Sequence, residues 1–245
     1  MSQQDVPVPP WERPRKRPAP ARVPLTRERI IDAAFAVLDR EGYDKMSMRQ
    51  VAAELGVAVS ALYAHVSAKD ELLQLMYNRM LRSVELPDPD PENWQEQIKE
   101  FARDGRTRML SHRDMARISM EQTPFTPELL PHIEKLLAIF RQAGLPDRVA
   151  AIAGDILSTF MDGFILQESI WQGRRVEAGE SGGTGDKGWP EMRAEIQKYF
   201  AALPADRFPN MVALADLMVD ESNDYRFDLG LDIILRGLAS YIEEK

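Results

Sequence analysis

The sequence predicts an all-α protein in which a small N-terminal helix-turn-helix unit precedes a larger helical domain. From Thr26 to the C-terminus, apolar residues recur at the three-to-four-residue spacing of helices, and no stretch shows the alternation typical of strands. The four residues Leu55–Ala58 have the length and the glycine of a turn that joins two helices at a steep angle. With 245 residues and 44% hydrophobic content, the chain can bury a small domain beside a larger one.

Three short helices are predicted first, each bounded by residues that favour helix ends. Thr26 is a suitable N-cap for a helix that ends before Gly42, and Ser47 caps a second helix over about 48–55. A third helix covers about 58–64. The first helix presents a continuous apolar stripe that consists of Ile30, Ile31, Ala34, Phe35, Val37 and Leu38.

Further helical periods follow, separated by proline-rich and glycine-rich connections. The predicted helices cover about 68–85, 91–110, 114–121, 128–143, 147–172, 190–202, 209–218 and 225–243. Residues 87–93, PDPDPEN, form a proline-broken link, and the glycine-rich stretch at about 174–189 is expected to be a mobile loop. We therefore divide the chain into an arm at 1–24, a helix-turn-helix domain at 25–70 and a larger domain at 71–245.

Charge is distributed unevenly along the chain, whose net charge is −8. Residues 1–24 carry five Lys or Arg against two Asp or Glu, whereas residues 81–245 carry nineteen against twenty-nine. An acidic body with a basic end suits a protein that contacts phosphates at one pole. An acidic soluble protein with a basic disordered tail fits the charge pattern equally well.

Several classes of protein are not indicated. The sequence has no cysteine, no run of about eighteen apolar residues and no apolar N-terminal segment, so we expect a cytoplasmic protein. It shows no nucleophile triad, no paired carboxylates with defined spacing and no phosphate loop after a strand, so we expect neither an enzyme nor catalytic residues. The histidines, His65, His112 and His132, lack metal-ligand spacing, and neither a metal nor a cofactor is predicted.

A family resemblance covers residues 25–76, which read LTRERIIDAAFAVLDREGYDKMSMRQVAAELGVAVSALYAHVSAKDELLQLM. This segment resembles the DNA-binding domain of the tetracycline-repressor (TetR) family of transcriptional regulators. Shorter stretches, WQEQIKEFARDGRTRMLSHRDMARI, FRQAGL and FDLGLDIILRGL, are similar to the tetracycline repressor subgroup. The resemblance implies a homodimeric repressor that a small molecule releases from a palindromic operator. Activation of transcription, or a ligand-independent dimeric DNA-binding or protein-interaction module, stays open.

By this resemblance, Ala58–His65 is a recognition helix that lies in the major groove of DNA. Arg49, early in the preceding helix, is at a position where family members contact bases, and arginine can bond both acceptors of a guanine. The other implied contacts are to bases by Val59, Ser60 and Ala61, to phosphates by Tyr63, His65 and Lys69, and to the DNA backbone by Ser47 and Met48. The alternative for Tyr63 and His65 is that they only cover a helix surface.

The N-terminal arm is crowded with prolines, which block helix formation. Its basic centre contains Arg13, Arg15, Lys16 and Arg17. These side chains are candidates for contacts to phosphates or to the adjacent minor groove. A solubilising disordered tail is the alternative interpretation.

The two apolar helices at about 147–172 and 225–243 correspond, by resemblance, to a four-helix dimer interface. The candidate interface residues are Ile152, Ile156, Leu231, Ile234, Leu235, Leu238 and Ile242. Packing within one chain is the alternative for one face of each helix.

The same resemblance implies a ligand cavity between the helices of the larger domain. Its candidate walls are Phe101, Met109, Met115, Ile118, Phe125, Leu136, Phe140, Phe160, Met161 and Phe164, with Gln122, Gln167 and Glu168 as polar contacts. Each apolar residue is alternatively plain core. An apolar, aromatic and methionine-rich lining favours a hydrophobic or aromatic effector.

The sequence departs from the tetracycline repressor where that protein holds its metal–drug complex. Ser119 stands in place of the metal-binding histidine, and Phe101 and Gly105 replace a drug-contacting asparagine and phenylalanine. A magnesium–tetracycline complex is therefore not the expected ligand. The tripeptide His112–Asp114 also occurs in the tetracycline repressor subgroup. By resemblance, it lies near the junction through which ligand binding affects the rest of the domain. A surface turn with a local ion pair is the other interpretation of this tripeptide.

Overall fold

The computed structural model describes residues 24–180, 189–220 and 222–242, and within these ranges it contains helices and no strand. The helices are α1 (Arg27–Glu41), α2 (Met48–Glu54), α3 (Val59–Tyr63), α4 (Lys69–Arg82), α5 (Trp94–Leu110), α6 (Met115–Glu121), α7 (Leu130–Gln142), α8 (Asp147–Glu180), α9 (Trp189–Ala201), α10 (Pro209–Ala213), α11 (Ala215–Asp220) and α12 (Asn223–Ala239). The predicted fold class, a three-helix helix-turn-helix unit joined to a larger helical domain, is confirmed.

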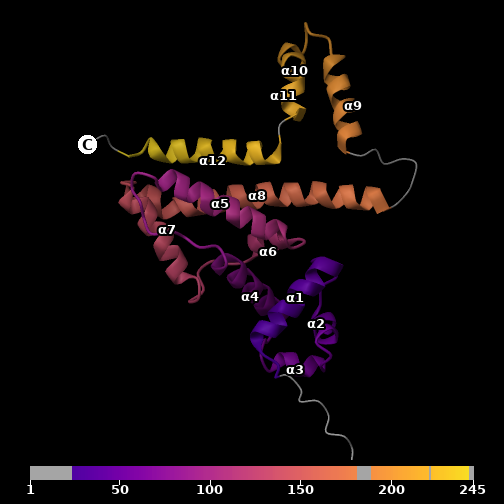
Figure 1. Ribbon diagram of the computed structural model, residues 1–245, viewed down its shortest axis with the longest axis vertical. Helices are drawn as coiled ribbons and strands as arrows, with labels where there is room; N and C mark the ends of the chain where they lie inside the picture. The colour runs from indigo at the N-terminus through magenta and orange to yellow at the C-terminus, as the bar shows by residue number, and fades with distance from the viewer. Residues whose placement is uncertain (1–23, 181–188, 221, 243–245) are drawn as a thin grey trace, which may run out of the picture.

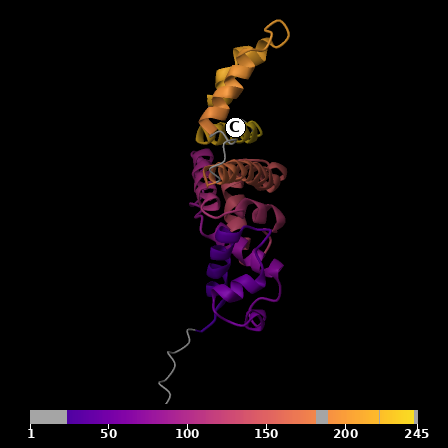
Figure 2. The ribbon, with the colours of Figure 1, turned by 90° about the vertical axis from the view of Figure 1, so that its right-hand side faces the viewer.

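The helices form three parts along one long axis. Helices α1–α3 make a head at one end, α4–α8 and α12 make the body, and α9–α11 project from the opposite end (Figure 1). Figure 2 shows the same order of parts from the side. Within the body, α8 packs against α5, α6, α7 and α12, whereas α9 packs against α10 and α11.

Local sequence signals set the ends of the head helices. The side chains of Thr26 and Ser47 each accept a hydrogen bond from the backbone amide three residues later. Gly42 follows α1 with a φ of 79°, and Gly56 lies in the turn between α2 and α3 with a φ of 64°. These left-handed conformations disfavour residues with a Cβ atom. The two glycines therefore fix the angles at which α2 and α3 leave their predecessors.

One apolar cluster runs from the head into the body. Among its fully buried side chains are Ile30 and Leu62 in the head, Met76 in α4, and Ile118 and Phe140 in the body. Helix α4 packs against α1 of the head and against α5 and α6 of the body. A displacement of the body helices can therefore move the head through these packed side chains.

Helix α8 is longer than predicted. The sequence predicts an end near residue 172 and a loop at about 174–189, but the helix continues to Glu180. The loop prediction is wrong for residues 174–180, because its strongest glycine signal begins only at Gly182. Residues 181–188 lie outside the described ranges, as do residues 1–23 of the predicted arm.

The segment predicted as one helix over 209–218 contains two. Helices α10 and α11 are separated at Leu214, whose ψ of 6° lies outside the helical range. The apolar spacing continues across this break, so periodicity alone did not reveal it.

Candidate functional site

Helix α3, the predicted recognition helix, is short and lies at the free end of the head (Figure 1). Its exposed residues are Ser60 and Tyr63, and Ala64, which directly follows the helix, is also exposed. Val59 and Ala61 are half-buried, while Leu62 and the nearby Val66 lie in the core. Small side chains on the outside allow the backbone of α3 to come close to a groove floor, which agrees with a DNA-reading role.

A polar network that the sequence did not reveal fixes the end of α3. The Arg27 Nε donates to the carbonyl oxygen of His65 (3.0 Å), and the guanidinium pairs with Glu71 (3.5 Å). Glu71 in turn accepts hydrogen bonds from the backbone N and the Oγ of Ser67, both at 2.6 Å. These hydrogen bonds lower the pKa of Glu71 and keep it ionised. The sequence does not predict the contact between Arg27 and His65, because the acceptor is a backbone carbonyl that lies 38 residues away.

The three predicted DNA-contact residues at the start of α2 differ in their exposure to solvent. Arg49 is exposed, as a base-reading side chain must be. Ser47 is half-buried and acts as the N-cap of α2, where its Oγ bonds the amide nitrogen and the side chain of Gln50. Met48 is buried in the head core, because the apolar side of this short helix needs it beside Val51. The predicted DNA contact of Met48 is therefore corrected to a core role.

Lys69 lies at the start of α4 and already has a partner inside the protein. Its Nζ donates to the carbonyl oxygen of Tyr43 (3.3 Å) and lies 4.9 Å from the centroid of the Tyr43 ring. The Arg117 guanidinium is 4.1 Å from the same ring, and the Tyr43 hydroxyl hydrogen-bonds Glu121. That hydrogen bond raises the pKa of Tyr43. Lys69 keeps two further N–H donors for a phosphate, so its DNA contact stays a prediction.

The tripeptide His112–Asp114 joins the body to the head. His112 Nδ1 lies 3.0 Å from Asp39 Oδ2, the backbone N of Arg113 donates to Asp39 Oδ1 (2.9 Å), and Asp114 Oδ2 accepts from the backbone N of Tyr43 (2.9 Å). Asp114 has a φ of 56°, a left-handed conformation. The local ion pair between Arg113 and Asp114 is present at 3.7 Å, but the tripeptide also ties α1 to the connection before α6.

A second tie runs along α4, where Gln74, Asn78 and Arg82 occupy one stripe at four-residue spacing. Gln74 donates to the carbonyl oxygen of Thr123 (2.9 Å) and accepts from its amide (3.3 Å). Asn78 donates to Glu128 (3.4 Å), and Arg82 lies 3.9 Å from the same carboxylate. The four-residue spacing shows in the sequence that these three polar side chains share one face of a helix. It does not show that Thr123 and Glu128 are their partners. Residues 123–128 are therefore bonded to three successive turns of the helix that leads to the head.

The candidate cavity residues fall into three groups. Met109, Met115, Ile118, Phe140 and Met161 are buried in one cluster, and Phe101, Gln122, Leu136, Phe160 and Phe164 are half-buried. Phe125 is 73% exposed and Gln167 is also exposed. These two predictions are corrected, because Phe125 lies on the loop after α6 and Gln167 on the outer side of α8. Glu168 is buried, but Arg106 occupies its carboxylate.

The interior between α4, α6 and α8 contains a small polar cluster. Ser119 Oγ donates to Asp162 Oδ2 (3.1 Å), and the buried Tyr77 lies close enough for both to affect its ionisation. Burial raises the pKa of Asp162 to about 6, and burial raises that of Tyr77 to about 12. Ser119, which stands where the tetracycline repressor has its metal-binding histidine, thus donates a hydrogen bond to a half-buried carboxyl group.

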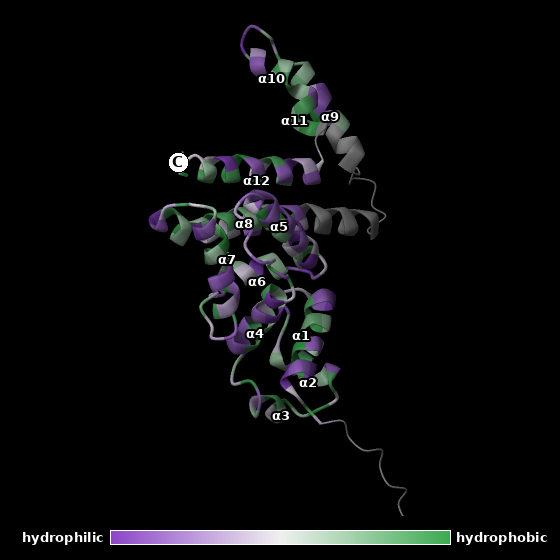
Figure 3. Cartoon of the chain, turned by 60° about the vertical axis from the view of Figure 1, so that its left-hand side comes forward, coloured by the Kyte–Doolittle hydropathy of each residue, from purple (hydrophilic) through white to green (hydrophobic). Residues whose placement is uncertain are grey.

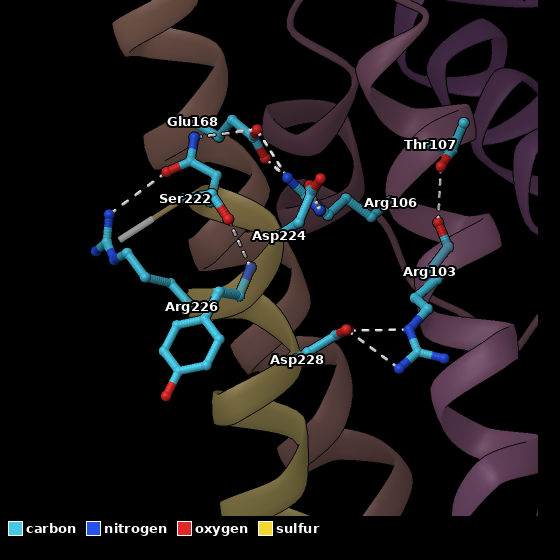
Figure 4. Close-up of polar contacts among 10 residues, drawn as sticks. Arg103, Arg106, Thr107, Glu168, Ser222, Asp224, Arg226 and Asp228 are labelled. Carbon is cyan, nitrogen blue, oxygen red and sulfur yellow. Dashed lines mark hydrogen bonds and ion pairs between the residues drawn. The ribbon is translucent and has the colours of Figure 1, made fainter. Parts of the chain in front are cut away.

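Helices α5 and α12 are joined by a ladder of opposite charges. Lys99 pairs with Asp232, Arg103 with Asp228 (2.9 Å) and Arg106 with Asp224 (2.7 Å). The acidic residues are spaced by four along α12, and the basic residues by four and then three along α5. The innermost rung adds Glu168 of α8, which binds the Arg106 guanidinium through two contacts of 2.8 and 2.9 Å (Figure 4). This ladder fixes the start of α12 against the wall of the predicted cavity.

The outer faces of α8 and α12 carry exposed apolar side chains. Ile152, Ile156 and Ile170 of α8 are exposed, as are Leu229 and Ile233 of α12, the last at 65%. Ile234 and Ile242 are half-buried. Leu231, Leu235 and Leu238 are corrected from interface to core, because the opposite face of α12 packs on α5 and α8 within the chain. Apolar residues also occur over most of α11 (Figure 3).

Two further observations concern ions and membranes. Within the described ranges, no group of three or more His, Asp or Glu side chains is placed to hold a metal ion. In the same ranges, one helical stretch, Asp147–Ile170 of α8, is long and apolar enough to cross a membrane. In the structure this stretch packs against α5, α6, α7 and α12.

Comparison with known proteins decides the family. The family model "Bacterial regulatory proteins, tetR family" matches residues 30–76, and "Tetracyclin repressor-like, C-terminal domain" matches residues 86–242. The chain belongs to the TetR family of transcriptional regulators. As a TetR protein it is a DNA-binding regulator, with α2 and α3 as its helix-turn-helix.

Individual TetR proteins are similar over most of the chain. The HTH-type transcriptional repressor DrrR1 of Streptomyces coeruleorubidus is 30% identical over 236 residues, which cover 95% of this chain and 83% of the relative. Tetracycline repressor protein class A from transposon 1721 of Escherichia coli is 30% identical over 215 residues, with coverages of 86% and 88%. The crystal structure of the Streptomyces coelicolor TetR family protein ActR in complex with actinorhodin has a TM-score of 0.77 and 39% identity, and covers 91% of this chain and 100% of that one.

Proposed function

We propose that this TetR protein is a cytoplasmic homodimeric repressor that binds a palindromic operator and leaves it when a hydrophobic or aromatic small molecule binds. The observation that carries the proposal is the combination of helix α3, which exposes Ser60 and Tyr63 at one end, with exposed isoleucine and leucine side chains on α8 and α12. One helix-turn-helix reads too few base pairs to be selective, so a dimer with two heads is needed. The names of DrrR1, a repressor, and of the ActR–actinorhodin complex support repression and a small-molecule effector.

The dimer interface is proposed to be formed by the outer faces of α8 and α12. Ile233→Glu places a charge on the most exposed apolar residue of α12, and burying it against a second copy is costly. We expect the dissociation constant of the dimer to rise by at least about tenfold, which is about 1.4 kcal/mol. Sedimentation velocity over a dilution series measures this, with Leu130→Glu on α7 as an exposed control. A variant as dimeric as the wild type speaks against this face.

Base reading is proposed to depend on Arg49 and phosphate binding on Lys69. Arg49→Ala is expected to cost about 1–3 kcal/mol on operator DNA and to relax the preference at one base pair of each half-site. Lys69→Ala is expected to weaken binding to all sequences alike and to reduce the salt dependence. Titrations of operator and random duplexes at several salt concentrations separate the two effects. Equal losses of Arg49→Ala on both duplexes contradict the base-reading role.

Coupling between effector and DNA is proposed to run through α4. The hydrogen bonds from Gln74 and Asn78 hold residues 123–128 against this helix, and Asp39 and Tyr43 bind the tripeptide before α6. A ligand that moves α6 or its following loop therefore shifts α4 and changes the separation of the two heads. A coupling of about 2.7 kcal/mol weakens operator binding about a hundredfold, and DNA must weaken effector binding equally.

The effector is not proposed to be a magnesium–tetracycline complex. The hydroxyl of Ser119 is engaged by Asp162, and a side chain at Gly105 meets Met161, whose Cε lies 3.1 Å from the position of an added Cβ. The lining favours apolar and aromatic molecules instead.

The experiment that tests the function is selection of bound duplexes from a random DNA library by the purified protein. A palindrome with half-sites about one helical turn apart, or a multiple of it, is expected. Failure to enrich any sequence at low salt removes the operator-binding proposal.

A ligand-independent dimeric DNA-binding protein is the second candidate. Met115, Ile118 and Phe140 are almost fully buried, which favours a packed core over a cavity at this place. A thermal-shift screen with hydrophobic compounds distinguishes the two, because a ligand that binds only the native state raises Tm.

A further inference from the structure

Helix α3 has few contacts of its own to hold it in place. It has five residues, and isolated helices shorter than about 12–15 residues are marginal in water. Its N-cap, Ala58, has no side chain that can bond the first amides, and of the helical residues only Leu62 is buried. Contacts from neighbouring segments must therefore set the position of α3.

The turn that ends α3 is bonded to a side chain of α1. The amides of His65 and Val66 close this turn by donating to the carbonyl oxygen of Leu62 (2.8 and 2.9 Å). The next carbonyl group along the chain, that of His65, accepts a hydrogen bond from Arg27 Nε (3.0 Å). Carbonyl groups at a helix end lack partners within the helix, and an arginine side chain can supply one. Arg27 thus connects the end of α3 to the start of α1.

The same guanidinium also reaches the first turn of α4. Arg27 Nη2 lies 3.5 Å from Glu71 Oε1, and the other oxygen of Glu71 accepts two hydrogen bonds from Ser67. Arginine presents its N–H donors in a rigid planar fork, so a single side chain can bind both acceptors in a fixed geometry. Arg27 therefore joins α1, the turn after α3 and the start of α4.

The predicted DNA contacts lie on both sides of this junction. Tyr63 and His65 come at the end of α3, and Lys69 is the first residue of α4. Hydrogen bonds to base edges weaken steeply when distance or angle changes, whereas attraction between a cation and phosphates is less directional. A displacement of α3 is therefore expected to harm base reading more than phosphate binding.

The exposure of the network limits its effect on global stability. The side chains of Arg27 and Glu71 are 55% and 34% exposed, and exposed ion pairs contribute little to the free energy of unfolding. The head has a core that includes Ile30, Leu38 and Leu62, so its folding does not depend on Arg27. The effect of Arg27 is local, because α3 has so few other constraints.

We propose that Arg27 is a positioning residue for operator reading. It holds α3 at a fixed place relative to α1 and α4, and so keeps the residues of α3 in register with the base edges without touching a base. The inference rests on the proposed operator binding through α3. It adds to that function a residue that lies outside the helix-turn-helix and that no sequence motif indicates.

The first test is amide hydrogen exchange of the full chain without DNA, on the millisecond-to-second timescale. Arg27→Ala is expected to speed exchange in residues 62–67 by about three- to tenfold, because the turn after α3 opens more often. The Tm is expected to stay close to that of the wild type. The matched control is Arg29→Ala, which removes the same charge from the same turn of α1, where the guanidinium donates to the carbonyl oxygen of Pro24 (2.7 Å). We expect this control to leave exchange in residues 62–67 unchanged.

The second test measures binding to a palindromic duplex selected from the random library and to a scrambled duplex of the same composition. Arg27→Ala is expected to lower the ratio of the two affinities by about tenfold, whereas Arg29→Ala is expected to keep the ratio of the wild type. Arg27→Lys keeps the charge but not the planar fork. We expect it to keep the salt dependence of the wild type and still to lose part of the preference for the palindrome.

Two outcomes overturn the inference while the operator proposal stands. One is unchanged exchange in residues 62–67 of Arg27→Ala. The other is an equal loss of affinity for both duplexes, with a salt slope reduced by about one, which marks Arg27 as a plain phosphate contact. Failure to select any palindrome removes the operator proposal and this inference together, and is recognised because the wild type itself then shows no preference.

Discussion

Replacing Arg106 by leucine is expected to lower the free energy of unfolding by about 3–5 kcal/mol. The Arg106 side chain is only 12% exposed, and it faces Glu168, which is 7% exposed. Its removal leaves the Glu168 carboxylate with a single described hydrogen bond, from Asn223 at 3.1 Å. A buried charge without its counter-charge is the most costly defect a single substitution can produce at this site.

Aromatic contacts add to this loss. The Arg106 guanidinium lies 5.0 Å from the ring centroid of Phe227 and 5.7 Å from that of Phe164. Cation–π contacts of this kind contribute about 0.5–2 kcal/mol. Leucine keeps part of the apolar packing against both rings but not the electrostatic attraction.

Urea unfolding at fixed protein concentration measures the effect. The matched control is Arg108→Leu on the same helix, where an exposed pair with Asp104 is expected to contribute about 0.3–0.5 kcal/mol. The double variant Arg106→Leu/Glu168→Leu is expected to recover much of the loss, because it removes both charges. A loss for Arg106→Leu no larger than that of the control contradicts the assignment of a buried pair.

The head was predictable because its signals are local. The caps at Thr26 and Ser47 and the glycines at positions 42 and 56 act within a few residues, and the structure contains the helices they imply. Met48 was misjudged for a related reason. In a helix of seven residues, one apolar position can point to the core or to the surface, and only the packed head decides between them.

For the body, the sequence predicted the helices but not which face of each helix is buried. Helix α12 is apolar on two sides, so its sequence cannot tell Leu235, which packs within the chain, from Ile233, which is exposed. The charged rungs between α5 and α12 follow steps of three or four residues that are visible in each helix, but their pairing joins residues more than 110 positions apart. The contact of Arg27 with the His65 carbonyl has no sequence signal at all.

Asp162→Asn is expected to stabilise the ligand-free protein at neutral pH by about 3 kcal/mol. Burial raises the pKa of Asp162 from its ordinary 3.8 to about 6. The native state therefore binds this proton more tightly than the unfolded state. When Asp162 is ionised above pH 6, the free energy of unfolding is lower by about 1.36 kcal/mol for each unit by which the two pKa values differ. Asparagine has no charge to bury, and its side-chain oxygen still accepts the hydrogen bond from Ser119.

The sign of this effect distinguishes Asp162 from the other carboxylates. A group with a raised pKa contributes its full stability at low pH and loses it as the pH rises from about 4 through 6, whereas Asp232, whose pKa is lowered by its bond to Lys99, loses stability as the pH falls. The difference between variant and wild type isolates Asp162. We expect it to grow from about 1 kcal/mol near pH 4.5 to about 3 kcal/mol near pH 7 in urea titrations. Asp155→Asn, at an exposed position on the same helix, is expected to show no such growth. A constant difference across this pH range contradicts a raised pKa of Asp162 in the native state.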